Sequence, residues 1–395
     1  MRFQFADRTL DTERRELQHK GRAVAAEPQV FDLLAFLIRH RDRVVSRDDL
    51  IAGVWGGRIV SESTLATRIN AARKAIGDDG TAQRLIKTVA RKGFRFVGAV
   101  EDDAGAPRLP PQPAAAPSQT ITFCRTADDV TLATAVVGQG PALIKTANWL
   151  NHLEHDWASP IWAPFLQRLA ARFTFVRYDG RGNGLSDREA ADISQAGFAR
   201  DLDAVVDAAG LDRFALLGLS QGAAAAISFA ARYPQRVTRL ILYGAYAQGR
   251  NRRDTPSDAA TAQTMLAMLR QGWGQPDSAF MRAFSSLYLS DASRAHVRWF
   301  ADMQRTSASG EMAARLRVAC DDIDVVDLLP AIKVPTLVIH ARHDHVAPYE
   351  QGRLLAARIP GARLVTLESE NHIPVPDDPA WARMMDEIES FASGA

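Results

Sequence analysis

The chain has 395 residues, of which 47% are hydrophobic and 24% are charged, so it is too long for one ordinary domain and has the composition of a folded protein. It contains no run of 18 apolar residues, and residues 1–7 lack the apolar core of a secretory signal. We therefore expect a cytoplasmic protein with no membrane partner. The two cysteines, Cys124 and Cys320, are far apart, which argues against a disulfide framework.

The net charge of +2 is unevenly distributed along the chain. Residues 1–98 contain 19 Lys and Arg against 12 Asp and Glu, a net charge of +7, whereas the remainder carries −5. Residues 99–120 are rich in Pro and Ala and offer little to bury, which predicts a linker. We expect a basic first domain at 1–98, a linker at 99–120 and a second domain at 121–395, with a polyanion as the first domain's partner.

Within the basic segment, alternating apolar residues over residues 3–10 predict short strands. Three helices are then expected: one after Pro28, one at the capping box Ser46–Asp49, and one from about residue 61. Two strands, at 85–89 and 93–97, follow and form a hairpin.

The third helix is predicted to read double-stranded DNA. Its apolar residues Leu65, Ile69, Ala72 and Ile76 share one face at 100° per residue. The other side chains offer hydroxyls and an amide to base edges and cations to phosphate. The predicted DNA contacts are Ser63, Thr64, Thr67, Arg68, Asn70, Arg73 and Lys74 on the helix, with Arg91 and Lys92 at the tip of the hairpin.

Four stretches carry a resemblance to a known family: Val45–Leu50, Val54-Trp55, Arg73–Asp79 and Thr88–Phe96. They resemble the winged-helix DNA-binding domain of OmpR/PhoB-type transcriptional regulators. The resemblance covers residues 1–98 and implies an α+β winged helix-turn-helix with the third helix as recognition helix. Neither a receiver domain nor a membrane span accompanies it in this sequence, so we expect a different input signal. The alternative is a winged helix that contacts another protein.

From residue 121 the pattern changes to strands alternating with helices, which is typical of a parallel sheet covered on both faces, the α/β class. Strands are predicted at 130–137, 142–146, 174–178, 214–217, 237–243, 336–340 and 363–367. Residues 147–159 are expected to form a loop. A helical insertion at about 247–329 predicts a cap that gives a ligand pocket apolar walls.

The pentapeptide Gly218-Leu219-Ser220-Gln221-Gly222 lies between an apolar strand and a small-residue helix, 223–227. That context is typical of a nucleophile elbow, in which the two glycines let strand and helix approach closely. Ser220 is the predicted nucleophile, and the backbone N–H of Gln221 is a predicted oxyanion donor. A serine in an ordinary tight turn is the alternative.

Asp344 lies just past the end of the strand 336–340, and His372 follows the strand 363–367. The chain order Ser220, Asp344, His372 is the order found in α/β-hydrolases. Ser220 is expected to attack a carbonyl, His372 to take and return the proton, and Asp344 to orient the imidazole.

The second domain resembles the α/β-hydrolase superfamily over roughly 120–393, including the Asp-x-Arg-Gly-x-Gly-x-Ser turn at Asp179–Ser186. The resemblance implies an α/β-hydrolase fold with a helical cap. It departs from the family at Lys145–Trp149, where a His-Gly pair is usual. We expect the second oxyanion donor to be the backbone N–H of Asn148, and an altered loop would slow turnover.

Two other clusters are weaker candidates. His340, His343, Asp344 and His345 could be taken for a metal site, but consecutive residues at a strand end point in different directions. His152, Glu154, His155 and Asp156 could line the pocket or lie in solvent. We expect neither a metal nor a cofactor.

These patterns together predict a DNA-binding transcriptional regulator whose α/β-hydrolase domain binds, and hydrolyses, a small ester-like or amide-like compound. The alternative is a receptor that uses the same pocket without turnover. A third interpretation is a plain hydrolase that the winged helix only localises. A homodimer is expected, because operators repeat half-sites.

Overall fold

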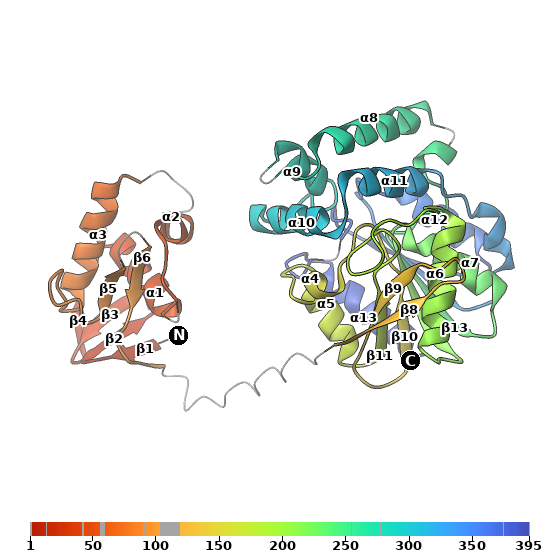
Figure 1. The fold of residues 1–395 in the computed structure, drawn as a ribbon. Coiled ribbons are helices and arrows are strands. Elements are labelled where there is room, and N and C mark those ends of the chain that lie inside the picture. The colour runs from red at the N-terminus through yellow and green to blue at the C-terminus, as the bar shows by residue number, and fades with distance from the viewer. Residues whose placement is uncertain are drawn as a thin grey trace. The chain divides into compact units, whose positions relative to one another are not determined.

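The computed structural model describes residues 2–394 except 13, 42, 56–59, 90–91, 103–118, 254, 276–277 and 374. They form two compact units, Met1–Pro113 and Ala114–Ala395 (Figure 1).

The first unit pairs an antiparallel sheet with three helices and a separate hairpin. In its described part the sheet order is β4-β3-β2-β1-β7. The strands are β1 (Arg2–Phe5), β2 (Arg8–Asp11), β3 (Glu16–His19), β4 (Arg22–Val24) and β7 (Val100–Asp102). The helices are α1 (Pro28–Arg39), α2 (Arg47–Trp55) and α3 (Glu62–Ala75), and the hairpin joins β5 (Ile86–Val89) to β6 (Gly93–Phe96).

The sheet of the first unit extends beyond the predicted boundary at residue 98. Val100 pairs with Phe5, so β7 is an edge strand on β1 and residues 100–102 do not belong to a linker. Main-chain hydrogen bonds hold this strand in the sheet. Its short sequence, Val-Glu-Asp, therefore needs no apolar alternation and does not indicate a strand.

Side-chain caps fix where two of the helices begin. Ser46 and Asp49 form the expected capping box: the backbone N–H of Ser46 donates to Asp49 Oδ2 at 2.9 Å, and that of Asp49 donates to Ser46 Oγ at 3.1 Å. The Oγ of Ser61 accepts from the backbone N–H of Thr64 at 3.2 Å and caps α3.

The second unit contains a mostly parallel sheet, whose order over the described residues is β15-β14-β13-β12-β10-β11-β9-β8. The strands are β8 (Thr120–Arg125), β9 (Thr131–Val137), β10 (Ala142–Lys145), β11 (Thr174–Tyr178), β12 (Phe214–Leu219), β13 (Val237–Tyr243), β14 (Thr336–Ala341) and β15 (Arg363–Leu367). Strands β10 to β15 run parallel, and β9 and β8 are antiparallel at one edge.

Helices cover both faces of this sheet. They are α4 (Leu153–Trp157), α5 (Trp162–Ala170), α6 (Gln195–Ala208), α7 (Gly222–Arg232), α12 (Tyr349–Arg358) and α13 (Trp381–Ser393). Helix α4 lies inside the segment 147–159, which was predicted to be loop throughout, and the side chain of His152 caps it. None of the helices in the described ranges is long and apolar enough to cross a membrane.

Over the described residues, the cap contains four α-helices inserted between β13 and β14. These are α8 (Pro256–Gly272), α9 (Ala279–Ser286), α10 (Arg294–Ser307) and α11 (Gly310–Asp321). Figure 1 shows them gathered at one end of the second unit. Phe284, Phe300 and Leu316 from the cap join the same apolar core as α5 and α13.

Strand β12 is central in the sheet and is covered on both faces. All six of its residues are buried. Leu217 belongs to the core shared with α5, α13 and the cap, and its neighbour Leu216 to the core under α6, α7 and α12. A continuous apolar run is typical of such a central parallel strand.

Candidate functional site

Ser220 lies at the sharp turn between β12 and α7. Its φ is +51°, an uncommon conformation for a residue other than glycine and one that indicates backbone strain. A Cβ on Gly218 would lie 2.7 Å from the Cα of Ala223, and one on Gly222 would lie 2.3 Å from the carbonyl oxygen of Ala147. The two glycines are therefore required by close contacts of the turn with its own helix and with the loop after β10.

Ser220, His372 and Asp344 lie in a hydrogen-bonded row. The Oγ of Ser220 is 2.9 Å from Nε2 of His372, and Nδ1 of His372 is 2.6 Å from Oδ2 of Asp344. All three residues are buried. With Nδ1 donating to the carboxylate, Nε2 is left free to accept the serine hydroxyl proton, which is the arrangement that general-base activation of a serine needs.

The carboxylate of Asp344 is held in its charged form. Its Oδ1 accepts from the backbone N–H groups of Val346 at 2.7 Å and Ala347 at 2.9 Å. Burial alone would raise the pKa of Asp344, but the neighbouring His372 and its hydrogen bond outweigh burial and lower that pKa below its usual value. Asp344 can therefore stabilise a positive charge on His372.

The loop after β10 lies beside the elbow. The backbone N–H of Thr146 donates to the carbonyl oxygen of Leu217 at 2.9 Å, which holds the loop against β12. Asn148 lines the same cavity as Ser220, whereas Gln221 is the first residue of the turn into α7. The predicted oxyanion donors thus come from two segments that touch at Gly222.

A cavity opens beside Ser220 and His372. Its walls are almost entirely apolar and aromatic, and Tyr288 and Phe300 come from the cap. The other lining residues are Asn148, Trp149, Trp162, Leu219, Tyr243 and Ile373. Such walls suit an apolar group attached to the carbonyl that Ser220 would attack.

The exposed surface of α3 carries most of the predicted DNA contacts. Leu65, Ile69, Ala72 and Ile76 are buried, as the helical spacing predicted. Ser63, Thr64, Thr67, Asn70 and Lys74 are exposed. Arg68 is partly exposed and forms an ion pair with Glu27, so its guanidinium is already partnered.

Arg73 does not lie on that surface, and the prediction that it contacts DNA is wrong. It is 5% exposed, and its guanidinium donates to the carbonyl oxygen of Ile86 at 2.9 Å and to Thr88 Oγ1 at 2.8 Å. The residue ties α3 to β5 instead. Lys92 is exposed in the hairpin, and Arg91 lies outside the described residues.

Comparison with known families now identifies both units. The model of the alpha/beta hydrolase fold matches residues 150–379. The chain belongs to the α/β-hydrolase fold family. A second model, of the C-terminal domain of transcriptional regulatory proteins, matches residues 21–96. The protein is therefore an α/β-hydrolase fused to an OmpR/PhoB-type DNA-binding regulatory domain, as both resemblances predicted.

Known proteins match this chain over about two thirds of its length. An uncharacterized protein of Mycobacterium tuberculosis is 30% identical over 289 residues, which are 69% of this chain and 81% of the relative. Pyrrolizixenacetamide deacetylase of Xenorhabdus hominickii is 28% identical and matches over 63% of this chain and 92% of its own length. The crystal structure of a hydrolase from Pseudomonas aeruginosa superposes with a TM-score of 0.56 at 27% identity, covering 69% of this chain and 96% of that one.

Within the described ranges, the structure gives no support for a metal site or a pocket-lining role in the two weaker clusters. The Nε2 of His340 is 2.8 Å from the carbonyl oxygen of Ala347, and His343 and His345 are exposed. No three His, Cys, Asp or Glu residues of the described chain are arranged to hold a metal ion. In the second cluster, His152 and Asp156 are buried and lie in neither solvent nor the cavity beside Ser220.

Lys145 is a buried residue of this hydrolase to which sequence reasoning gave no role. Its Nζ donates to Oδ1 of Asn148 and, at 3.2 Å, to the carbonyl oxygen of Thr146. Burial lowers its pKa, which the nearby Asp156 partly offsets. The sequence offered one sign of its importance: a lysine ends an apolar strand at a position where the family usually has another residue. Its partner Asn148 could be identified only from the structure.

Proposed function

We propose that the protein is a cytoplasmic DNA-binding transcriptional regulator that hydrolyses a small apolar ester or amide at Ser220. The observation that carries the proposal is the row of hydrogen bonds joining Ser220 to His372 at 2.9 Å and His372 to Asp344 at 2.6 Å. Asp344 then serves to orient the imidazole, and no metal is needed for this chemistry.

The proposed reaction has two halves. Ser220 Oγ attacks the carbonyl carbon while its proton passes to Nε2 of His372, and the oxyanion is stabilised by the backbone N–H groups of Gln221 and Asn148. Collapse of this intermediate breaks the bond to the leaving alcohol or amine, which takes the proton from His372. Water, deprotonated by His372, then attacks the acyl-serine. The bond between the acyl carbon and Ser220 Oγ breaks, His372 returns the proton to Oγ, and the acid is released.

The cavity beside Ser220, called the aromatic cavity here, is the basis for proposing that the acyl group of the substrate is apolar. Trp162, Tyr288 and Phe300 are among its walls, and a charged acyl chain would lose its hydration there without a counter-ion. The likeness to a relative named as a deacetylase supports acyl transfer from a small molecule as the reaction class.

The DNA contacts proposed for the first unit are Ser63, Thr64, Thr67, Arg68, Asn70 and Lys74 of α3, together with Arg91 and Lys92. The hydroxyls and the amide would meet base edges and the cations phosphate. We propose that the Pro-rich segment within 103–118 joins this domain to the hydrolase domain, and that two chains bind paired half-sites.

A receptor with a silent pocket is the second candidate. One observation favours it: Lys145-Thr146-Ala147 stands where the family usually has His-Gly before the oxyanion donor, and loss of one donor lowers rate by roughly 10²–10³. In that case the ligand would bind in the aromatic cavity and remain intact.

Turnover of p-nitrophenyl acetate and butyrate separates the two candidates. The wild-type chain is expected to release p-nitrophenol repeatedly, and Ser220→Ala to release none while binding DNA as the wild type does. A single burst without turnover, or no release by a chain that binds DNA normally, would contradict hydrolysis and favour the receptor.

A further inference from the structure

A second cavity lies on the other side of the loop that follows β10. It is called the second chamber below. Asn148 and Trp149 line both cavities, whereas Ser220 and His372 line only the first. The Asn148-Trp149 segment is therefore a wall shared by two separate spaces.

The second chamber contains two buried hydrogen-bond acceptors with no partner. Asn183 is 4% exposed, and its Oδ1 accepts no hydrogen bond from any described residue. The buried Oε1 of Gln221 is likewise without a partner in the described chain. Because buried polar groups in folded proteins are almost always hydrogen-bonded, a donor from outside the described chain would satisfy these two acceptors.

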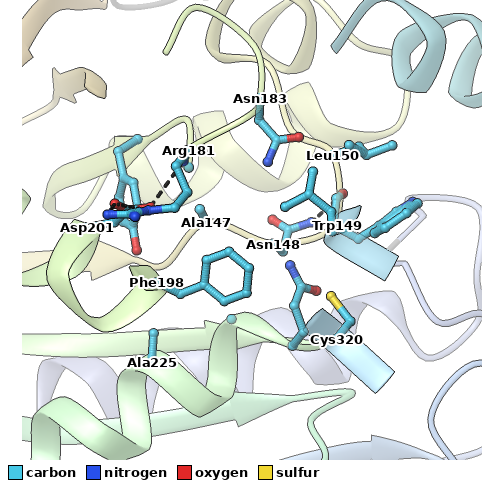
Figure 2. A pocket seen from close by; sticks show the side chains of 15 residues that line it. Ala147, Asn148, Trp149, Leu150, Arg181, Asn183, Phe198, Asp201, Ala225 and Cys320 are labelled. Atoms are coloured by element: carbon cyan, nitrogen blue, oxygen red, sulfur yellow. Dashed lines mark hydrogen bonds and ion pairs between the residues drawn. The ribbon is translucent and has the colours of Figure 1, made fainter. Parts of the chain in front are cut away.

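The charges around the second chamber are already neutralised. Arg181 is fully buried and donates to Asp201 at 2.9 Å and to Asp128 at 2.8 Å, and Figure 2 shows Arg181 and Asp201 paired at one side of the space. The thiol of Cys320 is neutral, because burial raises its pKa to about 11. A charged ligand would find no free counter-ion among these groups.

Apolar side chains form the rest of the lining. Phe198 comes from α6, Ala225 from α7 and Leu316 from the cap helix α11, and Figure 2 shows Phe198 and Ala225 on one side of the space and Asn183 on another. The lining thus combines an apolar body with a few convergent amides, which is typical of a small-molecule site.

We propose that the second chamber binds a small uncharged molecule with an N–H or O–H donor on an apolar body, such as a primary amide or an alcohol. One donor of the bound molecule bonds Asn183 Oδ1, and a molecule with a second N–H, such as a primary amide, also bonds Gln221 Oε1. The site is separate from the reaction at Ser220 and does not depend on turnover. Because the bound molecule contacts Asn148 and Gln221, whose backbone N–H groups face the reaction under the proposed function, occupancy alters the reactivity of Ser220.

The test uses two probes that differ only in their donors, benzamide and N,N-dimethylbenzamide. Each is titrated against the full-length Ser220→Ala chain by saturation-transfer NMR, so hydrolysis plays no part. Benzamide is expected to bind at least about tenfold more tightly than N,N-dimethylbenzamide, because only benzamide can donate a hydrogen bond to the buried acceptors. Asn183→Leu should remove this preference. Phe300→Leu, which alters only the cavity beside Ser220, should leave it unchanged.

Equal affinity for the two probes, or a preference that survives in Asn183→Leu, would overturn the proposal. So would a loss of preference in Phe300→Leu, because the probe would then be in the first cavity. If Asn183→Leu does not fold, Ala225→Met replaces it: the larger side chain fills the chamber and should abolish benzamide binding. Retained binding in a folded Ala225→Met chain would also overturn the proposal.

Discussion

The carbonyl oxygen of Tyr288, a residue of the cap, accepts the backbone N–H of His372 at 3.0 Å. The ring of Tyr288 also packs edge-on against the imidazole of His372, with 5.7 Å between ring centroids. The cap therefore positions the residue that would act as general base, besides forming a wall of the aromatic cavity.

Replacement of the Tyr288 ring tests this positioning. Tyr288→Ala should lower the rate of labelling of Ser220 by a fluorophosphonate more than tenfold, because the imidazole loses the surface that orients it. Tyr288→Phe should label at a near wild-type rate, since burial raises the pKa of Tyr288 to about 12 and the phenol carries no charge to lose. Equal rates for all three chains would show that the cap does not orient His372.

Neighbouring residues of α3 should respond differently to substitution. Lys74→Ala is expected to weaken DNA binding to all sequences and to reduce the slope of log K against log salt by roughly one unit, because one phosphate contact is lost. Arg73→Met should instead lower the free energy of unfolding by about 2 kcal/mol, because it leaves the carbonyl of Ile86 and the hydroxyl of Thr88 without their donor. Filter binding across salt concentrations and urea unfolding distinguish the two effects.

Gly222→Ala tests the contact between the elbow and the loop after β10. The added Cβ would lie 2.3 Å from the carbonyl oxygen of Ala147, so the helix and the loop must separate. We expect kcat for p-nitrophenyl acetate to fall about 10²-fold as the oxyanion donors move apart. Gly210→Ala is the control: it introduces strain at φ +62° with nothing within 4 Å, and should leave kcat unchanged. An unaltered kcat in Gly222→Ala would argue against this oxyanion hole.

His152 should make the hydrolase unit sensitive to acid. Burial lowers the pKa of His152 to about 4, so the folded chain keeps this histidine neutral while the unfolded chain protonates it below about pH 6.5. The unfolded state then binds more protons, and stability is lost as pH falls from about 6.5 to about 4, by on the order of 3 kcal/mol.

His152→Asn isolates that contribution, because Asn is also a favourable residue at a helix N-terminus and does not titrate. The loss of unfolding free energy between pH 7 and pH 4.5, measured by urea titration of the full chain, should be smaller in the variant than in the wild type. An identical loss in both chains would show that His152 does not titrate as expected.

The sequence predicted those features that depend on local pattern and on topology. Gly218 and Gly222 identified the elbow because only glycine permits the close approaches found there. Asp344 and His372 could be placed near Ser220 because the carboxyl ends of parallel strands meet at one edge of a sheet. The apolar face of α3 followed from helical spacing alone.

Features that depend on distant contacts could not be predicted in this way. Arg73 lies at the border between the two faces of α3, and only the position of β5 decides that its long side chain turns inward. The buried Lys145 donates hydrogen bonds to Asn148 and to a backbone carbonyl oxygen, and no periodicity of the sequence reveals these partners. The second chamber involves four separate segments and the cap, so no single stretch of sequence marks it.

The proposed hydrolysis depends on Ser220 being an activated nucleophile. Reaction of the full-length chain with a fluorophosphonate probe, followed by mass spectrometry of the labelled peptide, tests it most directly. We predict stoichiometric labelling at Ser220 in the wild type, none in Ser220→Ala, and a rate at least about 10³-fold lower in His372→Ala, which lacks the base. No labelling of a folded wild-type chain, or labelling of His372→Ala as fast as that of the wild type, would contradict the activation of Ser220.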